Sequence, residues 1–251
     1  VTGGTRGIGR AISERLKADG FDVAANFAGN EEAARQCEAD LGVKCYKFDV
    51  ASYEATGEAL KQIESDLGPV DVVVNNAGIT RDAPFHKMTL EQWNEVINTD
   101  LTSAFNVTRQ VWDGMRERGW GRIINISGGN ARNAGNLSGG ARNVSLVHMT
   151  KTLATQVGKF GITVNCIHPG TTRTERTISL MEARGKELGM SPADAEAHDF
   201  ADGSPRTNHI NRMVDASEIG YLTAYLASDK SWAVTGEVIM AGGGTGNAVY
   251  Y

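Results

Sequence analysis

Cysteine is scarce in this sequence. Its three cysteines, Cys37, Cys45 and Cys166, are scattered and show neither a CxxC pair nor the spacing of metal ligands. Such a set gives no basis for a disulfide framework or a metal site, so we expect reduced structural thiols.

Long hydrophobic runs and an excess of positive charge are also missing. No apolar stretch approaches the length needed to span a bilayer, and no signal-peptide pattern opens the sequence. The formal net charge of −5 provides no electrostatic attraction for nucleic acid or an anionic membrane. We therefore expect a cytoplasmic protein whose partner is a small-molecule substrate, not nucleic acid or membrane.

The start of the sequence lacks both a methionine and a strand. Val1 stands almost directly before a glycine-rich loop, and loops of this kind follow a strand. We therefore expect a few residues to precede Val1.

Short apolar runs alternate with longer amphipathic stretches along the chain. Strands are predicted at Phe21–Phe27, Lys44–Phe48, Val70–Asn75, Arg122–Ile126, Gly161–Ile167 and Glu237–Met240. Helices are predicted at Gly9–Asp19, Glu31–Leu41, Tyr53–Leu67, Leu90–Arg118 and Val144–Phe160. This alternation, without a linker or a repeat, predicts one α/β domain over residues 1–251, with a Rossmann-type doubly wound parallel sheet.

One polar segment, Thr174–Arg212, interrupts this alternation. Within it, Ser191-Pro192-Ala193-Asp194 is a capping signal that predicts the start of a short helix. Long insertions late in an α/β domain are often mobile lids over a substrate cleft. We expect a lid-like insertion near 174–212, and a loop with no role in binding is the alternative.

The glycine-rich loop directly precedes the first predicted helix. Glycines allow a tight turn and a close approach of the backbone to a pyrophosphate, whose charge suits the unpaired N–H groups of a helix N-terminus. A purely structural glycine turn is the alternative. The loop, Thr2-Gly3-Gly4-Thr5-Arg6-Gly7-Ile8-Gly9, predicts dinucleotide binding by Gly3, Thr5, Arg6, Gly7, Ile8 and Gly9.

The end of the second strand of the fold indicates which dinucleotide is preferred. An NAD site usually has an acidic residue there, but this strand ends Ala25-Asn26-Phe27-Ala28. Without that acid a 2′-phosphate is not repelled, and Arg6 in the loop is placed to pair with it. We expect NADP(H) to be preferred over NAD(H); the alternative is that Arg6 is only a solvated surface charge.

Four motifs in order resemble the short-chain dehydrogenase/reductase family over essentially the whole chain. They are Thr2-Gly3-x-x-x-Gly7-x-Gly9, Asp49-Val50, Asn75-Asn76-Ala77-Gly78 and Pro169-Gly170. The resemblance implies that Asp49 contacts the adenine and that the Asn-Asn-Ala-Gly run stabilises the sheet beside the cofactor. It further implies that Pro169-Gly170 lies near the nicotinamide and that Thr174 reaches the carboxamide. Asp49, Val50, Asn76, Ala77, Gly78, Pro169, Gly170 and Thr174 thus join the predicted cofactor-binding residues.

Residues 1–127 resemble one branch of that family more closely, the acetoacetyl-CoA and 3-oxoacyl reductases. The runs Asn75–Asp82 and Asn98-Thr99-Asp100-Leu101 are typical of this branch. Residues 128–251 resemble a divergent member, and whether the two halves are a natural combination stays open.

The Tyr-x-x-x-Lys pair of that family is missing. The resemblance implies a tyrosine that transfers a proton and a lysine four residues later that binds the nicotinamide ribose. Counting from Thr150-Lys151 and from Pro169 puts these positions at Gly139 and Asn143, and no tyrosine occurs between Tyr53 and Tyr221.

Other polar residues remain near the predicted site. Ser127 is the nearest hydroxyl to the usual serine position, which falls at Gly128, and Asn143 can still bind a ribose hydroxyl. We take Ser127 and Asn143 as the candidate catalytic residues. Arg142 and His148 could act as charge or proton donors, and a surface or packing role is the alternative for each.

Three functions remain open. The first is an NADP(H)-dependent oxidoreductase of a carbonyl or alcohol, acting on a 3-oxoacyl thioester with an atypical or impaired site. The second is a catalytically silent dinucleotide-binding regulator or scaffold, and the third is a lyase-like enzyme that reuses the fold without hydride transfer. The resemblance also implies a homotetramer or homodimer. The substrate, the direction of reaction and the occurrence of turnover stay open.

Overall fold

A parallel β-sheet forms the centre of the computed structural model, which describes residues 1–245 apart from the side chain of Asn130. Its strands are β3 (Val72–Asn75), β4 (Gly121–Ile126), β5 (Ile162–Pro169) and β8 (Val238–Ala241), in that spatial order. A second parallel pair is formed by β1 (Ala24–Phe27) and β2 (Lys44–Lys47). The predicted domain also contains residues 246–251, which lie outside the described residues.

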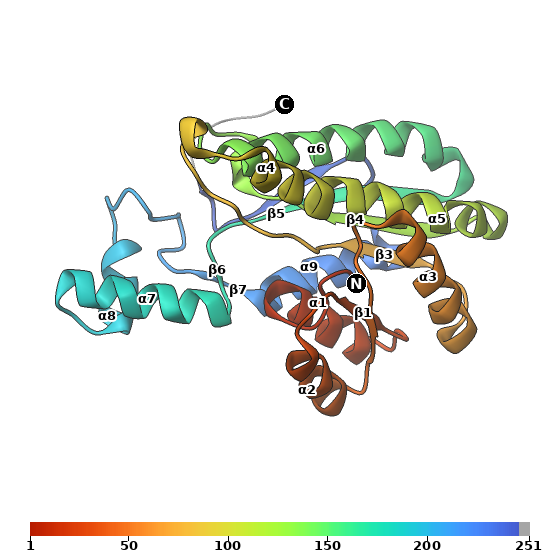
Figure 1. Cartoon of the computed structure of the whole chain (residues 1–251), viewed down its shortest axis with the longest axis horizontal. Coiled ribbons are helices and arrows are strands. Elements are labelled where there is room, and N and C mark those ends of the chain that lie inside the picture. The colour runs from red at the N-terminus through yellow and green to blue at the C-terminus, as the bar shows by residue number, and fades with distance from the viewer. Residues whose placement is uncertain (246–251) are drawn as a thin grey trace.

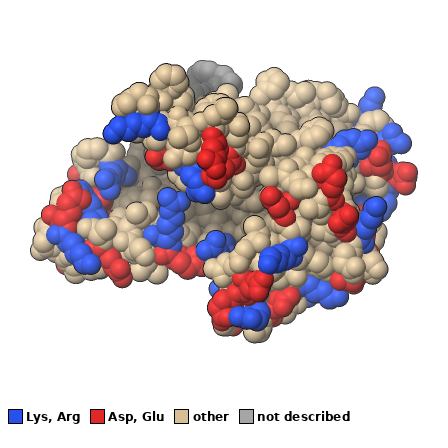
Figure 2. Space-filling view, viewed as in Figure 1, with Lys and Arg blue, Asp and Glu red and all other residues tan. Residues whose placement is uncertain are grey.

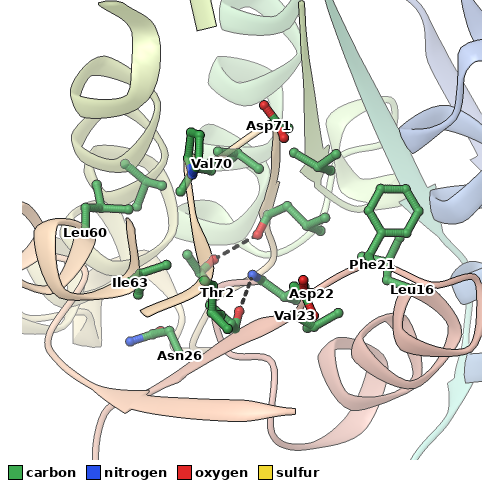
Figure 3. Close-up of a pocket in the computed structure, with 18 of the residues that line it drawn as sticks. Thr2, Leu16, Phe21, Asp22, Val23, Asn26, Leu60, Ile63, Val70 and Asp71 are labelled. Atoms are coloured by element: carbon green, nitrogen blue, oxygen red, sulfur yellow. Dashed lines mark hydrogen bonds between the residues drawn. The ribbon is translucent and has the colours of Figure 1, made fainter. Parts of the chain in front are cut away.

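The backbone of Val1 and Thr2 bridges the two groups of strands. The Val1 carbonyl accepts a hydrogen bond from Asn26 N at 2.9 Å, and Thr2 N donates to the Val74 carbonyl at 3.0 Å. Beside this bridge, β1 and β3 face each other across a cleft of about 240 Å³ (Figure 3). Side chains such as Phe21, Leu60 and Ile63 line the cleft and make it largely apolar.

Helices cover both faces of the sheet (Figure 1). Neighbouring strand residues point to opposite faces, so Val74 and Ile124 contribute to one core, whereas Val73 and Ile123 contribute to the other. The first core includes side chains from α1 (Gly7–Ala18), α2 (Glu31–Leu41) and α9 (Ala216–Ala227), and the second from α3 (Tyr53–Leu67), α5 (Ser103–Arg118) and α6 (Leu137–Val157). The predicted Rossmann-type doubly wound architecture is confirmed.

Two predicted helices differ from the observed ones. The segment predicted as one helix over Leu90–Arg118 consists of α4 (Leu90–Ile97), a π-helical turn (Asn98–Thr102) and α5. The helix predicted from Val144 begins earlier, as α6, because the Asn136 side chain accepts a hydrogen bond from Gly139 N at 2.7 Å and caps it.

The polar insertion forms a small lobe beside the sheet, at the left of Figure 1. It contains α7 (Glu175–Leu188) and α8 (Pro192–Asp199), and a short strand pair, β6 (Thr172–Arg173) with β7 (Val214–Asp215), joins it to the sheet. Helix α8 begins where the capping signal predicts, with the Ser191 hydroxyl accepting from Asp194 N at 3.1 Å. Helices α7 and α9 were not among the predicted elements.

Ion pairs cross-link this lobe. The Arg173 guanidinium lies 2.6 Å from Glu196 and 3.0 Å from Asp215. Asp199 is buried and pairs with Arg184 at 3.1 Å and Arg206 at 2.9 Å. The hydrogen bonds from Arg184 hold the pKa of Asp199 below its usual value although burial opposes this.

Within residues 1–245, every helix is too short or too polar to cross a lipid bilayer. Over the same residues, no cluster of histidine, cysteine or acidic side chains is arranged to hold a metal ion.

Candidate active site

The glycine-rich loop has a backbone that strongly favours glycine. Gly3 and Gly7 have φ angles of +60° and +53°, in the left-handed region. A Cβ on Gly9 would lie 2.1 Å from the Gly3 carbonyl oxygen. The loop therefore has no space for a side chain at Gly9, and its N–H groups lie at the start of α1.

The loop after β3 holds this turn in place. The Asn76 amide donates to the Thr2 carbonyl at 2.9 Å, and the Thr2 hydroxyl accepts from the N–H groups of Asn76 and Ala77, both at 2.9 Å. Next to them, a Cβ on Gly78 would lie 3.2 Å from an oxygen of Asp100. The predicted residues 76–78 thus lie directly against the predicted phosphate loop.

The start of α1 accepts an anion. Gly7 N donates to the two carboxylate oxygens of Glu175, at 3.1 and 3.3 Å, and these oxygens stand where phosphate oxygens of a dinucleotide are expected. The preceding residue, Thr174, also lies beside Gly7. The loop therefore fits a pyrophosphate in both charge and backbone shape, and the predicted Thr174 lies at this site.

Two further predicted contacts lie around this loop. Asp49 is exposed and accepts from Ala51 N at 2.9 Å, whereas Val50 is buried. At the other side, Pro169 and Gly170 end β5 against the end of β8, where a Cβ on Gly170 would lie 2.6 Å from Gly242.

The end of β1 has no carboxylate that faces the loop. The Asn26 side chain is buried, accepts from Gly3 N at 3.2 Å and donates to the Phe48 carbonyl at 2.9 Å. Arg6 is exposed, and its side chain makes no ion pair within residues 1–245. An arginine is therefore available at this corner and no acidic strand residue opposes it.

Ser127 and Asn143 are in contact at the end of β4. The Ser127 hydroxyl lies 3.2 Å from Asn143 Oδ1 and 3.3 Å from the Asn143 carbonyl, and both residues are buried. A Cβ on Gly128 would lie 3.0 Å from Asn143 Nδ2, so the asparagine amide fills the space in front of that glycine. The structure thus brings together the two predicted catalytic residues, and their roles stay predictions.

A buried ion pair lies on the other side of Asn143. Asp100, in the π-helical turn, has no exposed side-chain surface and lies 2.9 Å from Arg142 Nη1. Its other oxygen accepts from Ile79 N at 2.8 Å. Burial raises the pKa of Asp100 to about 6, against the opposing effects of Arg142 and the Ile79 amide.

Sequence and structure comparisons agree with this geometry. A family model described as short chain dehydrogenase matches residues 1–185. The chain belongs to the short chain dehydrogenase family. This confirms the predicted resemblance and the predicted class of enzyme, a short-chain oxidoreductase.

Relatives of known name cover almost the whole chain. Acetoacetyl-CoA reductase of Shinella zoogloeoides is 45% identical over 246 residues, which are 97% of this chain and 96% of that protein. The 3-oxoacyl-acyl-carrier-protein reductase FabG of Salmonella typhimurium is 36% identical over 249 residues, 97% of this chain and 95% of that one. Both halves of the chain therefore match the branch that the first half resembles.

A solved structure of the same fold is similar throughout. A phenylalanine-to-tryptophan variant of actinorhodin polyketide ketoreductase, crystallised with NADPH, has a TM-score of 0.87 and 34% sequence identity. The similarity covers 99% of this chain and 96% of the ketoreductase.

The two positions at which the resemblance implies a tyrosine and a lysine lie near the start of α6. Gly139, at the expected tyrosine position, lies in its first turn, where a Cβ would meet the capping Asn136 oxygen at 3.0 Å. Asn143 holds Ser127 instead of presenting an ammonium group. The cation beside the site belongs to Arg142, whose neighbour in space is Asp100.

Sequence reasoning missed His168. This residue follows Ile167 on β5, and Ile167 receives the hydrogen bond of Ser127 N at 2.9 Å. Its ring is fully buried, and neither nitrogen has a hydrogen-bond partner within residues 1–245. Burial, with a smaller effect of Arg132, lowers the pKa of His168 to about 4. Its position directly before the predicted Pro169 was the one sequence feature that could have drawn attention to His168. His148, a residue the sequence suggested, is exposed.

Proposed function

We propose that this chain is an NADP(H)-dependent oxidoreductase that interconverts a 3-oxoacyl thioester and the corresponding 3-hydroxyacyl thioester through an atypical catalytic site. The observation that carries this proposal is the 45% identity to an acetoacetyl-CoA reductase over nearly the full length of both chains. The anion-binding start of α1 supports the cofactor class, because a dinucleotide needs such a place for its pyrophosphate.

The preference for NADP(H) is supported by the corner between the glycine loop and β1. The exposed Arg6 suits a 2′-phosphate, and the inward-turned Asn26 puts no negative charge there. Figure 2 shows lysine and arginine side chains around the hollow beside the α7–α8 lobe, on a chain whose formal net charge is −5. The similar ketoreductase was crystallised with NADPH.

The chain's own residues bind and orient the reactants in this proposal. A bound nicotinamide would supply the hydride. The N–H groups at the start of α1 bind the pyrophosphate, Ser127 and Asn143 form a hydrogen-bonded pair beside the nicotinamide end, and Thr174 reaches the carboxamide. No tyrosine or lysine stands at 139 or 143 to transfer a proton or bind the ribose.

A second candidate function follows from the absence of a tyrosine at position 139 and of a lysine at position 143. Loss of a general acid typically costs about 10²–10⁴ in rate, so Gly139 and Asn143 favour a dinucleotide-binding protein with little or no turnover. The lyase-like alternative is weaker, because the glycine loop that suits a dinucleotide is intact.

A coupled assay of binding and turnover separates these functions. NADPH and NADH are titrated first, and NADPH oxidation is then followed with acetoacetyl-CoA. We expect tight NADPH binding and a rate below the ordinary range of about 1–10³ s⁻¹. Binding without any substrate-dependent oxidation supports the silent protein, whereas a rate in the ordinary range shows that the site is atypical but not impaired.

A graft of the missing pair tests the same point. Gly139→Tyr with Asn143→Lys raises the rate if the surrounding pocket is suited to carbonyl reduction. Asn143→Lys alone is the matched control, since it changes the Ser127 contact without adding a proton donor. No gain from the double variant would contradict the proposal that the surrounding pocket is suited to carbonyl reduction.

We also propose a symmetric homodimer or homotetramer that pairs the long helices α5 and α6. Phe105 on α5 and Val144 on α6 expose 54% and 50% of their surfaces, and such apolar exposure favours burial against a second copy. Light scattering at micromolar concentration tests this, and a monomeric mass would contradict it. The cytoplasmic location stays a prediction.

A further inference from the structure

A small polar cavity lies between the loop after β3 and the first turns of α6. It measures about 130 Å³, well above the roughly 10–15 Å³ that one water molecule needs. Thr80, Ser138, Gly139, Arg142 and Asn143 contribute to its wall. The cavity therefore has room for a short acyl group surrounded mostly by polar side chains.

The cavity lies at the end of the sheet where the glycine loop is found. In open α/β sheets, ligands bind beyond the carboxyl ends of the strands, where these loops meet. A continuous series of contacts connects the two places: Ala77 lies against the loop, Gly78 against Asp100, and Asp100 against Arg142. Asn143, in the cavity wall, also contacts Ser127 at the end of β4.

Arg81, Asp82 and Arg142 are the charged residues that line this cavity. Arg81 pairs with the partly exposed Glu95 at 2.7 Å, whereas Arg142 lies beside the buried Asp100. Arg142 Nη1 lies 2.9 Å from Asp100 Oδ2 as an ion pair without hydrogen-bond geometry, and Ile79 N donates to Oδ1 of the same carboxylate. The Arg142 side chain is only 19% exposed. Its Nε is buried and makes no hydrogen bond within the described chain, so only the exposed part of the guanidinium can reach a ligand in the cavity.

Burying the Arg142 cation costs desolvation free energy. Burying a charged pair in place of apolar residues is often neutral or unfavourable for stability. Its benefit is a fixed guanidinium, and such groups recognise oxygen atoms that carry negative charge. An arginine is always protonated in proteins, so it stabilises such an oxygen without transferring a proton.

We propose that Arg142, positioned by Asp100, binds the keto oxygen of the substrate in this cavity. The proposal rests on the proposed function for the class of ligand, a 3-oxoacyl thioester. When the solvent buffer removes a proton from the carbon between the two carbonyl groups, the keto oxygen carries the negative charge of the enolate, and this form binds the guanidinium most strongly. Binding by Arg142 also agrees with the slow turnover that we expect, because the guanidinium that binds the keto oxygen cannot protonate it.

Binding without turnover tests this site separately from the reductase activity. Acetoacetyl-CoA is titrated into the protein without NADPH at about pH 7.5 by calorimetry, and the ultraviolet absorption of the enolate is recorded. Wild-type protein binds the thioester and strengthens the enolate band. Asp100→Asn with Arg142→Gln removes both charges, leaves no unpaired buried carboxylate, and weakens thioester binding at least about 10-fold while abolishing the band increase.

Two measurements control for a structural effect. The melting temperature and the NADPH affinity of the double variant stay close to the wild-type values. Asp71→Asn with Arg118→Gln neutralises a more exposed pair, 3.0 Å apart, that lies away from the cavity, and it leaves thioester binding unchanged. If the first double variant does not fold, Arg142→Lys keeps a cation for Asp100 and still loses most of the band increase, because its compact ammonium lacks the planar guanidinium fork.

The outcomes separate the two proposals. Wild-type affinity and an unchanged enolate band in the folded double variant, or in Arg142→Lys, overturn the assignment of Arg142. Absence of thioester binding to the wild-type protein overturns it too. Thioester binding that depends on Arg142, without any NADPH oxidation, supports this site and removes the reductase proposal.

Discussion

The glycine-loop site and the cavity at the start of α6 are built by different means. The first consists of backbone N–H groups, glycines and the amides of Asn26 and Asn76. The second contains a buried pair of opposite charges, Asp100 and Arg142. A site made from backbone tolerates almost no change of residue, whereas a site made from side chains can exchange its charges and keep the fold.

This difference concerns the positions at which the resemblance implies a tyrosine and a lysine, because both lie at the second site. The loop keeps the glycines that the resemblance requires, because a Cβ on Gly9 has no space. At the start of α6 no comparable steric limit operates, and Gly139 meets only the flexible side chain of Asn136. A change of residue at Gly139 therefore does not require a change in how the loop is folded.

Gly9→Ala produces the largest effect, because it tests the backbone-built site. The added methyl group collides with the Gly3 carbonyl, so the loop must open and its N–H groups lose their alignment. We expect NADPH affinity to fall by more than about 100-fold, which corresponds to roughly 2.7 kcal/mol, as measured by fluorescence titration. Gly158→Ala is the control, since no atom lies within 4 Å of a Cβ there. A Gly9→Ala protein that binds NADPH normally would contradict the steric argument.

The cofactor end was largely predictable from sequence, and the substrate end was not. Local sequence patterns reveal the strands and the glycine loop. They also reveal the Asn-Asn-Ala-Gly run, whose Asn76 contacts that loop. The pairing of Asp100 with Arg142 depends on a π-helical turn and on the early start of α6, which Ser138, Gly139 and Gly140 conceal by breaking the apolar periodicity. Helix α7 escaped prediction because its buried surface is small and its contacts include a capping box and the ion pairs of Arg184.

Two buried ionisable groups, His168 and Asp100, make the free energy of unfolding depend on pH in opposite directions. The pKa of His168 falls from 6.5 in the unfolded chain to about 4, so its contribution to stability is lost as the pH falls through that window. The pKa of Asp100 rises from 3.8 to about 6, so its contribution increases as the pH falls from about 6. Each effect is about 3 kcal/mol, and in the wild-type protein the two largely cancel between about pH 6 and 4.

Substitution of either residue removes that cancellation. Relative to the wild type, His168→Leu becomes more stable as the pH is lowered from about 6.5 to 4.5, and Asp100→Asn becomes less stable between about pH 6 and 4.5. Urea unfolding at several pH values measures both differences. If the free energies of unfolding of His168→Leu and of the wild type changed equally with pH, His168 would not be responsible for this pH dependence.

Arg6→Ala changes the cofactor preference without altering the loop backbone. The exposed arginine pairs with a 2′-phosphate, so its loss weakens NADPH binding by about 1–3 kcal/mol and leaves NADH binding nearly unchanged. Titration of both cofactors measures this, with Arg35→Ala, an exposed arginine on α2, as the control. Equal losses for NADPH and NADH would remove the assignment of Arg6 to the 2′-phosphate.

Glu175→Gln has the smallest expected effect and tests whether a carboxylate of the α7–α8 lobe competes with the cofactor for the glycine loop. The Glu175 carboxylate, at the first residue of α7, accepts the hydrogen bonds of Gly7 N that a pyrophosphate requires. A bound dinucleotide must therefore displace this carboxylate and shift the start of α7. The amide competes less well than an anion at a helix N-terminus, so NADPH binds about two- to fivefold more tightly to the variant. Glu182→Gln, farther along the same helix, leaves the affinity unchanged. Equal affinity in Glu175→Gln and the wild type would show that the carboxylate leaves the loop without cost, and the α7–α8 lobe would then not oppose cofactor entry.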